Sequence, residues 1–475
     1  MTRSLIVIGA GVSGLAAAHR ALELDPERRV HVLEASPRVG GLIRTERITH
    51  ESAGTFLVEQ GPDSIISEKP AALRLAERLG LSDQVLSTNS ADRGAFVVYE
   101  GSLERIPEGF SMMAPSQALP ILRSRILTPR GKLRLLSELF IPKGKISPDD
   151  DVDTASFVER RFGKEVLERL AAPLMGGIYG TRLSELSLKS TMPRFLDLER
   201  EHRSVTWGLL KKRRQAARSE RPGLGNDPSS SVRYGLFFSF KDGVQTLTDA
   251  LAAQLGDRIR TRCAVQTVQR TELGYRVVLP SGESLDAAHL ICALPARAMA
   301  PLLGSVDGDL ASELASIPYG STATVAFGWP RAAVPHALDA FGFVVPDREN
   351  RRIIASTWAS KKFQGRAPGD YVLLRAFVGA GESAALNAET DGPLIDLARS
   401  ELRELLGVTA RPLFASVSRQ LNAMPKYIVG HSARVARIEA LLEKAPGLRI
   451  AGNSLYGVGI PDAIAAGERA AEALR

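Results

Sequence analysis

The sequence has few of the residues that metal and thiol chemistry require. Only two of its 475 residues are cysteines, Cys263 and Cys292, too few for a disulfide framework or a four-thiolate site. The seven histidines are scattered, and no two stand within one helical turn, so no His-x-x-x-His pair is present for zinc. We therefore expect no bound metal, and two free thiols suit a reducing compartment.

Two further absences exclude other classes of protein. The segment nearest to the Gly-x-Ser-x-Gly motif of serine hydrolases, Gly452–Tyr456, lacks the second glycine. The apolar run Leu5–Ala18 is 14 residues long, too short to cross a bilayer, and its glycines have the spacing of a phosphate loop. No other run reaches the length of a membrane span, so we expect neither a serine hydrolase nor a membrane-embedded protein.

The charge is basic but unevenly distributed. The net charge is +8, and the run Lys211–Arg221 alone holds six basic residues and one acidic residue. No aromatic residue interrupts this run, which weakens nucleic-acid recognition, and a solvated helix end leading into a loop explains it equally well. We predict that the chain does not bind nucleic acid.

The order of the predicted elements indicates an α/β protein. Its length alone favours about three domains. Strands are predicted at Leu5–Ile8, Val30–Glu34, Leu290–Ala293 and Leu448–Ala451, separated by a mostly helical stretch and a strand-rich one. Arg221–Ser231 is the best candidate for a linker. These patterns predict one discontinuous nucleotide-binding domain with a helical insert and a mixed-sheet insert.

A glycine-rich loop follows the first strand. Gly9, Gly11 and Gly14 form a Gly-x-Gly-x-x-Gly motif that leads directly into a helix, and Glu34 ends the next strand twenty residues after Gly14. In this context the glycines permit a tight turn and let the backbone approach a pyrophosphate at the helix N-terminus. Glu34 can accept the ribose hydroxyls and would repel a 2′-phosphate, so FAD or NAD is expected.

Two later segments favour FAD. Gly40-Gly41 lets the backbone approach a ligand, and Arg38 or Arg44 can bond the pyrophosphate, a second phosphate contact that nicotinamide dehydrogenases do not need. At the far end of the chain, Gly457–Ile460 opens the last helix. A helix N-terminus directed at the flavin would stabilise the negative charge of the reduced ring.

These motifs carry a resemblance to a known family. Over nearly its whole length the chain resembles the FAD-dependent porphyrinogen oxidases, a branch of the amine-oxidase-like flavoproteins. The segments more specific to this branch are Glu59–Ser64, Gly176–Gly180, Leu186-Ser187, Glu201–Ser204 and Gly457–Asp462. One departure is Ala463, where the family usually has cysteine.

The resemblance implies a Rossmann-like FAD-binding domain of the p-hydroxybenzoate-hydroxylase type, a mixed-sheet substrate domain and a helical domain. The expected FAD-binding domain comprises residues 1–68, 232–305 and 418–475. The substrate domain comprises 69–93 and 306–417, the helical domain 94–210, and a basic linker 211–231. The residues expected to contact FAD are Gly9, Ala10, Gly11, Val12, Ser13, Gly14, Glu34, Ala35, Arg38, Gly40, Gly41, Leu42, Gly61, Pro62, Asp63, Ser64, Val265, Ala293, Gly452, Asn453, Gly457, Val458, Gly459 and Ile460.

Within the branch, the sequence favours coproporphyrinogen III as substrate. Protoporphyrinogen oxidases usually carry an arginine in the stretch before Phe96–Tyr99, where this chain has Ala95, with Arg93 close but offset. Lys69 falls where the bacterial coproporphyrinogen III oxidases carry a basic residue. Lys69, Arg93 and Arg203 are therefore expected to bind substrate propionates. No catalytic side chain is expected, because the chemistry takes place at the flavin.

The implied reaction removes six electrons from the macrocycle in three steps, with dioxygen as acceptor and hydrogen peroxide as product, in haem biosynthesis. A protoporphyrinogen IX oxidase is the alternative. More remote ones are a flavin amine oxidase, a carotenoid-type desaturase and a non-catalytic carrier of FAD or porphyrin. We expect a cytoplasmic monomer or homodimer, and the resemblance also admits peripheral contact with the inner face of the cell membrane.

Overall fold

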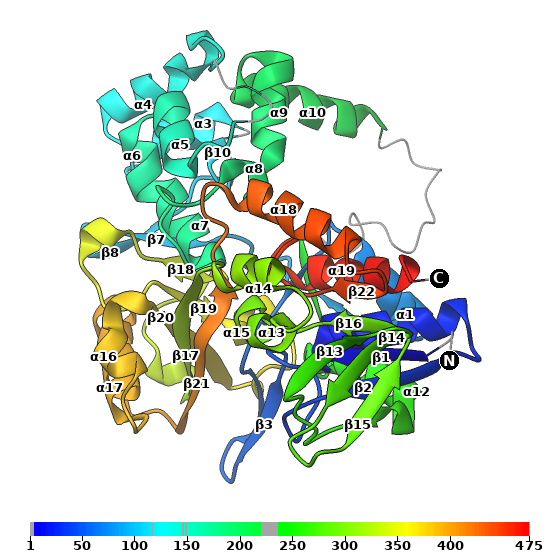
Figure 1. Cartoon of the computed structure of the whole chain (residues 1–475). Helices are drawn as coiled ribbons and strands as arrows, with labels where there is room; N and C mark the ends of the chain where they lie inside the picture. Colours follow the sequence, from blue (N-terminus) through cyan, green and yellow to red (C-terminus); the bar gives the residue numbers. More distant parts are fainter. Residues whose placement is uncertain (1–3, 116, 145–146, 148–149, 220–235, 475) are drawn as a thin grey trace.

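The chain folds into three regions that Figure 1 shows side by side. The computed structural model describes residues 4–115, 117–144, 147, 150–219 and 236–474. A parallel-sheet domain contains both described ends of the chain, a seven-stranded domain lies beside it, and a helical domain extends from both (Figure 1). The predicted linker Arg221–Ser231 lies outside the described residues. The α/β class and the discontinuous parallel sheet are confirmed.

The parallel-sheet domain is assembled from distant parts of the sequence. Its sheet has the strand order β12–β2–β1–β16–β22, and every neighbouring pair is parallel. The strands are β1 (Ser4–Ile8), β2 (Arg29–Leu33), β12 (Ile259–Arg260), β16 (His289–Cys292) and β22 (Leu448–Ile450). The central strand is apolar and buried on both faces, as expected where helices cover a parallel sheet. All five carboxyl ends therefore meet at one edge.

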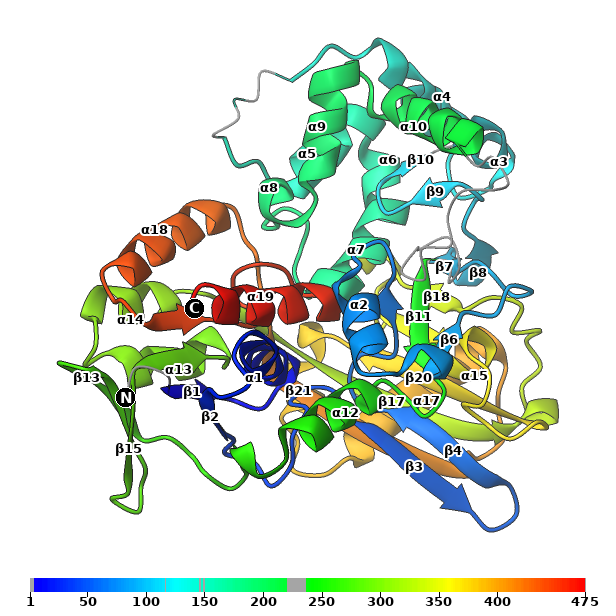
Figure 2. The ribbon, with the colours of Figure 1, turned by 90° about the vertical axis from the view of Figure 1, so that its right-hand side faces the viewer.

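Four helices pack on one side of this sheet. They are α1 (Val12–Leu24), α2 (Ala71–Arg78), α12 (Gln245–Leu255) and α19 (Ile460–Glu472), and their apolar residues share one buried cluster with β1 and β2. Figure 2 shows α1 beside α19, with α12 and α2 next to them. The assignment of residues 69–93 to the substrate domain is thus wrong for α2. An amphipathic pattern predicts a buried helix face but not the domain that covers it.

The seven-stranded domain is a mixed sheet with the order β21–β17–β20–β19–β18–β7–β8. Its longest strands are β17 (Tyr319–Pro330), β20 (Tyr371–Val378) and β21 (Phe414–Pro425), and helix α17 (Gly392–Leu406) packs on it. The shorter strands are β18 (Gly342–Val344), β19 (Ala355–Trp358), β7 (Phe96–Tyr99) and β8 (Ser102–Arg105). Because β7 and β8 belong to this sheet, the predicted start of the helical domain at residue 94 is too early.

The helical domain begins at about residue 118. Its helices are α3 (Ala118–Arg123), α4 (Pro129–Leu136), α5 (Thr154–Phe162), α6 (Lys164–Val166), α7 (Ala172–Tyr179), α8 (Leu188–Thr191), α9 (Pro193–His202) and α10 (Val205–Ser219). The predicted linker from residue 211 therefore starts inside α10, and the basic run begins as a helix end, as the alternative interpretation has it. In the described part of the chain, no helix is long and apolar enough to span a bilayer.

We predict that Gly467→Ala separates α19 from α1. A β-carbon at Gly467 would lie 2.1 Å from the carbonyl oxygen of Ser13, so the two helices would have to move apart. We expect the free energy of unfolding to fall by about 2–3 kcal/mol, as for other overpacked cores, and to be measurable by urea titration. Gly308→Ala is the matched control, because nothing lies within 4 Å of a β-carbon there. An equal loss in both variants would contradict this reading of the helix contact.

Candidate functional site

The glycine loop lies at the carboxyl edge of the parallel sheet, between β1 and α1. Gly9 has a φ of +101°, which favours glycine, and a β-carbon there would lie 2.7 Å from the carbonyl oxygen of Ala293. A β-carbon at Gly14 would lie 1.9 Å from the carbonyl oxygen of Gly9. Gly11, by contrast, faces open space, with nothing within 4 Å. Two glycines thus close the turn, and the third leaves the helix N-terminus open to a ligand.

Glu34 is held at the end of β2, beside this loop. One carboxylate oxygen accepts a hydrogen bond from the Ala10 amide and the other from the Ser36 amide, both at 2.8 Å. A carboxylate has about four acceptor positions, so both oxygens retain capacity for ribose hydroxyls. The chain after β12 runs alongside, since the amides of Arg262 and Cys263 bond the carbonyls of Ser36 and Glu34. That path brings Val265, one of the predicted FAD contacts, towards the same end of the site.

The Gly-Gly loop packs directly on the glycine loop. The amide of Gly40 donates to the carbonyl of Ala10 at 2.8 Å, and a β-carbon on Gly41 would lie 3.2 Å from the α-carbon of Gly11. Arg38, one of the two arginines predicted to bond the pyrophosphate, makes its hydrogen bonds within this loop. Its guanidinium donates to the carbonyls of three loop residues, Val39, Gly41 and Ile43. It therefore fixes the shape of the loop, whereas Arg44 is exposed.

The predicted segments after β16 and β22 also lie at this edge of the sheet. Ala293 follows β16 and lies against Gly9, and Gly452-Asn453 follows β22. Beyond them, the turn Gly457–Ile460 opens α19, with Gly457 at a φ of +127°. The structure thus brings the N-terminal, middle and C-terminal motifs together at one edge, as the sequence predicts.

Tyr427 fixes the C-terminal part of this edge. Its hydroxyl donates to the carbonyl of Asn453 and accepts from the amide of Gly457, both at 2.7 Å, and burial raises the pKa of the phenol. Its ring stacks on His431 at 3.9 Å. Burial lowers the pKa of His431 to about 4, so this histidine is neutral at pH 7. Sequence reasoning gave Tyr427 no function, because a single tyrosine carries no local signal for a contact across thirty residues.

The loop Gly61–Ser64 is anchored by two cations from the seven-stranded domain. Asp63 forms ion pairs with Lys362 at 2.9 Å and Arg375 at 3.0 Å, and Arg375 also donates to the carbonyl of Gly61 at 2.7 Å. Burial opposes ionisation of Asp63, but the two cations outweigh it and hold its pKa well below the usual range. Two positive charges thus face one negative charge. Sequence reasoning did not pair these residues, which are far apart in the chain.

The three predicted substrate residues lie in different surroundings. Lys69 bonds both carboxylate oxygens of Asp462 at 2.7 Å, beside the turn that opens α19. Arg93 is exposed on the loop before β7, and its carbonyl accepts a bond from Arg105. Arg203 follows α9, and its guanidinium donates to the carbonyl of Phe140 inside the helical domain. Its contacts tie Arg203 to that domain and do not bring it to the glycine loops.

The site fits a dinucleotide cofactor such as FAD. The open α-carbon at Gly11, the helix N-terminus and the held carboxylate of Glu34 match a pyrophosphate followed by an adenosine. From Gly11 the Gly-Gly loop leads towards Gly61, where a β-carbon would lie 2.0 Å from the carbonyl oxygen of Leu42. The redox ring would therefore lie between Gly61–Ser64 and Gly457–Ile460.

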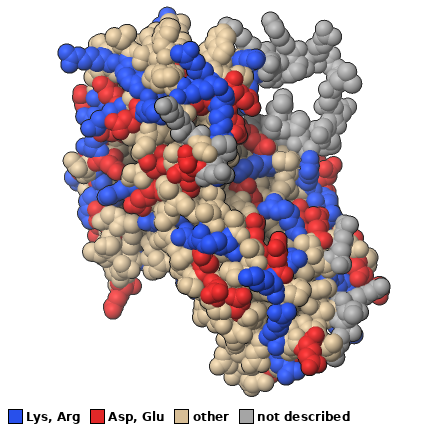
Figure 3. Space-filling model, turned by 45° about the horizontal axis from the view of Figure 1, so that its top comes forward, with Lys and Arg blue, Asp and Glu red and all other residues tan. Residues whose placement is uncertain are grey.

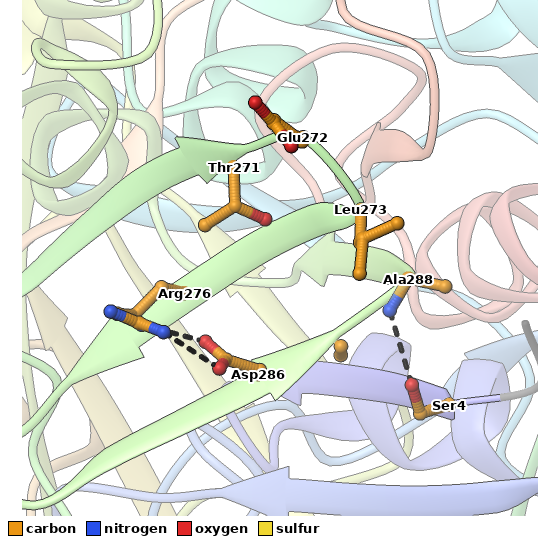
Figure 4. Close-up of a pocket in the computed structure, with 8 residues that line it drawn as sticks. Ser4, Thr271, Glu272, Leu273, Arg276, Asp286 and Ala288 are labelled. Atoms are coloured by element: carbon orange, nitrogen blue, oxygen red, sulfur yellow. Dashed lines mark hydrogen bonds and ion pairs between the residues drawn. The ribbon is translucent and has the colours of Figure 1, made fainter. Parts of the chain in front are cut away.

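A separate hollow of about 310 Å³ lies at the outer edge of the parallel-sheet domain and is not part of this site. It is lined by the hairpin of β13 (Thr267–Thr271) and β14 (Gly274–Val278) with β15 (Ser284–Ala287) (Figure 4). Arg276 and Asp286, on neighbouring strands, pair with each other at 2.8 Å, and Glu272 is the remaining charged residue of the lining. None of the predicted site residues lines this hollow.

Comparisons with known proteins match nearly the whole chain. Residues 12–475 match the family model described as flavin containing amine oxidoreductase. Coproporphyrinogen III oxidase of Bacillus subtilis is 32% identical over 98% of this chain and 97% of its own, and that of Propionibacterium freudenreichii is 34% identical over 98% and 90%. Human protoporphyrinogen oxidase is 30% identical over 99% and 98%.

One solved structure is similar to this chain over nearly its whole length. The crystal structure of a candidate protoporphyrinogen oxidase from Exiguobacterium sp. 255-15 superposes with a TM-score of 0.84 at 29% identity. The match covers 99% of this chain and 98% of that chain. The likeness therefore includes all three regions and not the parallel-sheet domain alone.

We predict that Asp63→Asn strongly destabilises the fold. The substitution leaves Lys362 and Arg375 buried without their counter-charge, and we expect a loss of about 3–5 kcal/mol in a urea titration at pH 7. Asp92→Asn is the control, because Asp92 lies 4.0 Å from the more exposed Lys361, and the loss there should stay below about 1 kcal/mol.

Wild type and Asp63→Asn also test how the stabilisation by Asp63 depends on pH. Because the pKa of Asp63 is lowered on folding, its contribution is complete above the unfolded value near 3.8 and is lost as the pH falls below it. The difference between wild type and Asp63→Asn should therefore be constant from pH 5 to 7 and shrink only in stronger acid. A difference that already shrinks at pH 6 would contradict this account.

Proposed function

Because the chain belongs to the flavin containing amine oxidoreductase family, we propose that it is an FAD-dependent oxidase that converts coproporphyrinogen III to coproporphyrin III in haem biosynthesis. The observation that carries the proposal is the similarity to two coproporphyrinogen III oxidases along 98% of the chain. That length includes the seven-stranded and helical domains, in which substrate specificity is expected to reside. The enzyme is an oxidoreductase, and FAD is its cofactor.

The residues that would hold FAD follow from the geometry of the carboxyl edge. Glu34 would bind the adenosine ribose, and the amides at the start of α1 would bind the pyrophosphate next to Gly11. Gly61–Ser64 and Gly457–Ile460 would flank the ring. Their positions are fixed by the Asp63 ion pairs and by the hydroxyl of Tyr427.

When bound, FAD supplies the two-electron acceptor, so that three turnovers with three molecules of dioxygen remove six electrons and yield three of hydrogen peroxide. The protein has to bind the macrocycle, orient a meso carbon towards the ring and exclude water. No strong base is required from the side chains. Cationic groups at the mouth of the site would bind the propionates, and Lys69 is the best supported of the three predicted ones, because it lies beside Gly457–Ile460.

A second candidate function is the oxidation of protoporphyrinogen IX. The human protoporphyrinogen oxidase is almost as similar as the bacterial coproporphyrinogen III oxidases, at 30% identity over nearly the whole chain. Ala95 weighs against this candidate, since protoporphyrinogen oxidases usually have an arginine in that stretch. The two functions share fold, cofactor and chemistry and differ only in the number of propionates.

We predict faster turnover of the substrate with four propionates. Anaerobically prepared coproporphyrinogen III and protoporphyrinogen IX would be mixed with holoenzyme and air, with porphyrin fluorescence and peroxide followed together. We expect kcat/KM for coproporphyrinogen III to be about tenfold or more higher, a difference of about 1.4 kcal/mol. Faster turnover of protoporphyrinogen IX would select the second candidate. Turnover of neither by a protein with bound FAD would contradict both.

We further propose that this cytoplasmic enzyme, a monomer or homodimer, contacts the membrane surface through its helical domain. Several large apolar side chains there are exposed on adjoining elements, α3, α4, the turn Ser137–Phe140 and α10. They are Leu119, Leu122, Leu133, Leu136, Leu139, Phe140 and Trp207. Exposed cations such as Arg130 and Lys143 stand among them, a combination that suits an anionic interface. Figure 3 shows that lysine and arginine are otherwise interspersed with acidic and uncharged residues.

The prediction is that Leu133→Ser with Phe140→Ser weakens binding to vesicles of anionic phospholipid. The two side chains are 70% and 77% exposed, so their loss should not disturb the fold, and vesicle co-sedimentation should fall about tenfold. Leu273→Ser is the control, because Leu273 is 71% exposed on a distant hairpin. Equal sedimentation of all three proteins would exclude this surface, and light scattering of the same samples would determine the oligomeric state.

A further inference from the structure

Lys69 and Asp462 form an ion pair beside the turn Gly457–Ile460, which would flank the proposed flavin. The ammonium group of Lys69 lies 2.7 Å from each carboxylate oxygen of Asp462. The Lys69 side chain is 54% exposed and that of Asp462 is 16% exposed. Among the described residues, the side chains of Lys69 and Asp462 form hydrogen bonds with each other and with no third residue. The lysine is therefore accessible to a ligand but already occupied by a carboxylate.

The pair lies where the helical domain meets the parallel-sheet domain. Asp462 is in the first turn of α19, and a β-carbon on Gly457 would lie 2.5 Å from one of its carboxylate oxygens. One residue before Lys69, Glu68 pairs with Arg194 of α9 at 3.2 Å. Burial raises the pKa of Tyr179, at the end of α7, and the charge of Asp462 adds to this rise. The pair of Lys69 and Asp462 thus lies close to side chains of two helices of the helical domain, α7 and α9.

The groove beside the pair has room for a substituent. A hollow of about 400 Å³ runs between α2 and α19, and its charged lining residues are the cations Lys69, Arg74 and Arg469 and the carboxylates Asp462, Glu68, Glu468 and Glu472. The pair therefore borders open space and is not packed inside the protein. Water can solvate the half-exposed ammonium of Lys69 when the pair separates, whereas the carboxylate of Asp462 is only 16% exposed. A ligand carboxylate can therefore reach Lys69 from the open side of the pair.

We propose that Asp462 is a specificity-determining residue that occupies Lys69 in place of a substrate carboxylate and releases it when the porphyrinogen binds. The inference rests on the proposed function. A propionate has the same carboxylate chemistry as an aspartate side chain, so it can replace Asp462 on Lys69 without leaving the lysine unpaired. A macrocycle whose side chains are uncharged cannot make this exchange and finds no free cation. The pair thus selects against such molecules as well as for carboxylates.

The first experiment compares two variants that each remove one negative charge from the same neighbourhood. Asp462→Asn frees Lys69, whereas Glu68→Gln breaks the adjacent ion pair with Arg194 and leaves Lys69 bound to Asp462. Any general effect of charge on an anionic ligand is common to both. Coproporphyrin III, the stable product, is the probe, and its dissociation constant is measured by fluorescence quenching without turnover. KM and kcat for coproporphyrinogen III are measured in parallel.

We expect Asp462→Asn to lower the dissociation constant of coproporphyrin III and the KM about three- to fivefold, and Glu68→Gln to change either by less than about 1.5-fold. Equal effects of the two variants would overturn the proposal, since they would reflect net charge alone. A higher dissociation constant in Asp462→Asn would also overturn it. Flavin content and thermal unfolding confirm that each variant is folded, and Asp462→Ser serves as a second variant if the first binds no FAD.

The second experiment removes the lysine. Lys69→Met should raise the dissociation constant of coproporphyrin III about fivefold. When Asp462→Asn is added to Lys69→Met, it should change this dissociation constant no more than Glu68→Gln does. If Asp462→Asn still tightens coproporphyrin III binding when Lys69 is replaced by Met, Asp462 acts independently of the pair, which contradicts the proposal. The uncharged comparison is the tetramethyl ester of coproporphyrin III, whose binding should not improve in Asp462→Asn. If wild type neither binds coproporphyrin III nor oxidises coproporphyrinogen III, the proposed function itself fails. This result differs from a failure of the Asp462 proposal alone, in which wild type binds the porphyrin and the two variants change its dissociation constant equally.

Discussion

The backbone of α1 lies so close to its neighbours that two of its contacts leave no room for a methyl group. Gly14 meets the carbonyl of Gly9 on one side, and Gly467 of α19 meets the carbonyl of Ser13 on the other. These contacts fix where α1 begins relative to the sheet and bring α19 beside it. Since both helices start at the same edge of the domain, their N-termini lie together with the strand ends of β2, β16 and β22.

Ion pairs and hydrogen bonds then connect this edge of the parallel-sheet domain to the seven-stranded domain. Asp63 belongs to a loop of the parallel-sheet domain, and its two partners, Lys362 and Arg375, belong to the seven-stranded domain. The hydroxyl of Tyr427 similarly connects the end of β21 to the turns after β22. Bonds of this kind lose their geometry if either domain shifts, so the two domains must keep one relative position for the loop Gly61–Ser64 to keep its shape.

The sequence predicted the parts of the site that depend on local order along the chain. The glycine loop, Glu34 and the turn before the last helix could be recognised because each stands at a fixed distance from a strand or helix end. The partners of Asp63 and Lys69 could not be recognised, because they lie 299 and 393 residues away and nothing local signals them. The same limit explains α2, which was assigned to the substrate domain because nothing local signals which core buries its apolar face.

The discontinuous sheet has a consequence for how the protein forms during synthesis. Strand β1 is made first, but one neighbour, β16, lies some 280 residues later, and the outermost strand β22 and helix α19 come at the very end. Until residues 448–472 leave the ribosome, the apolar side of α1 that α19 covers has no partner. The nascent chain therefore carries an incomplete cofactor site and an exposed core face until β22 and α19 have been made, and those two elements complete the domain.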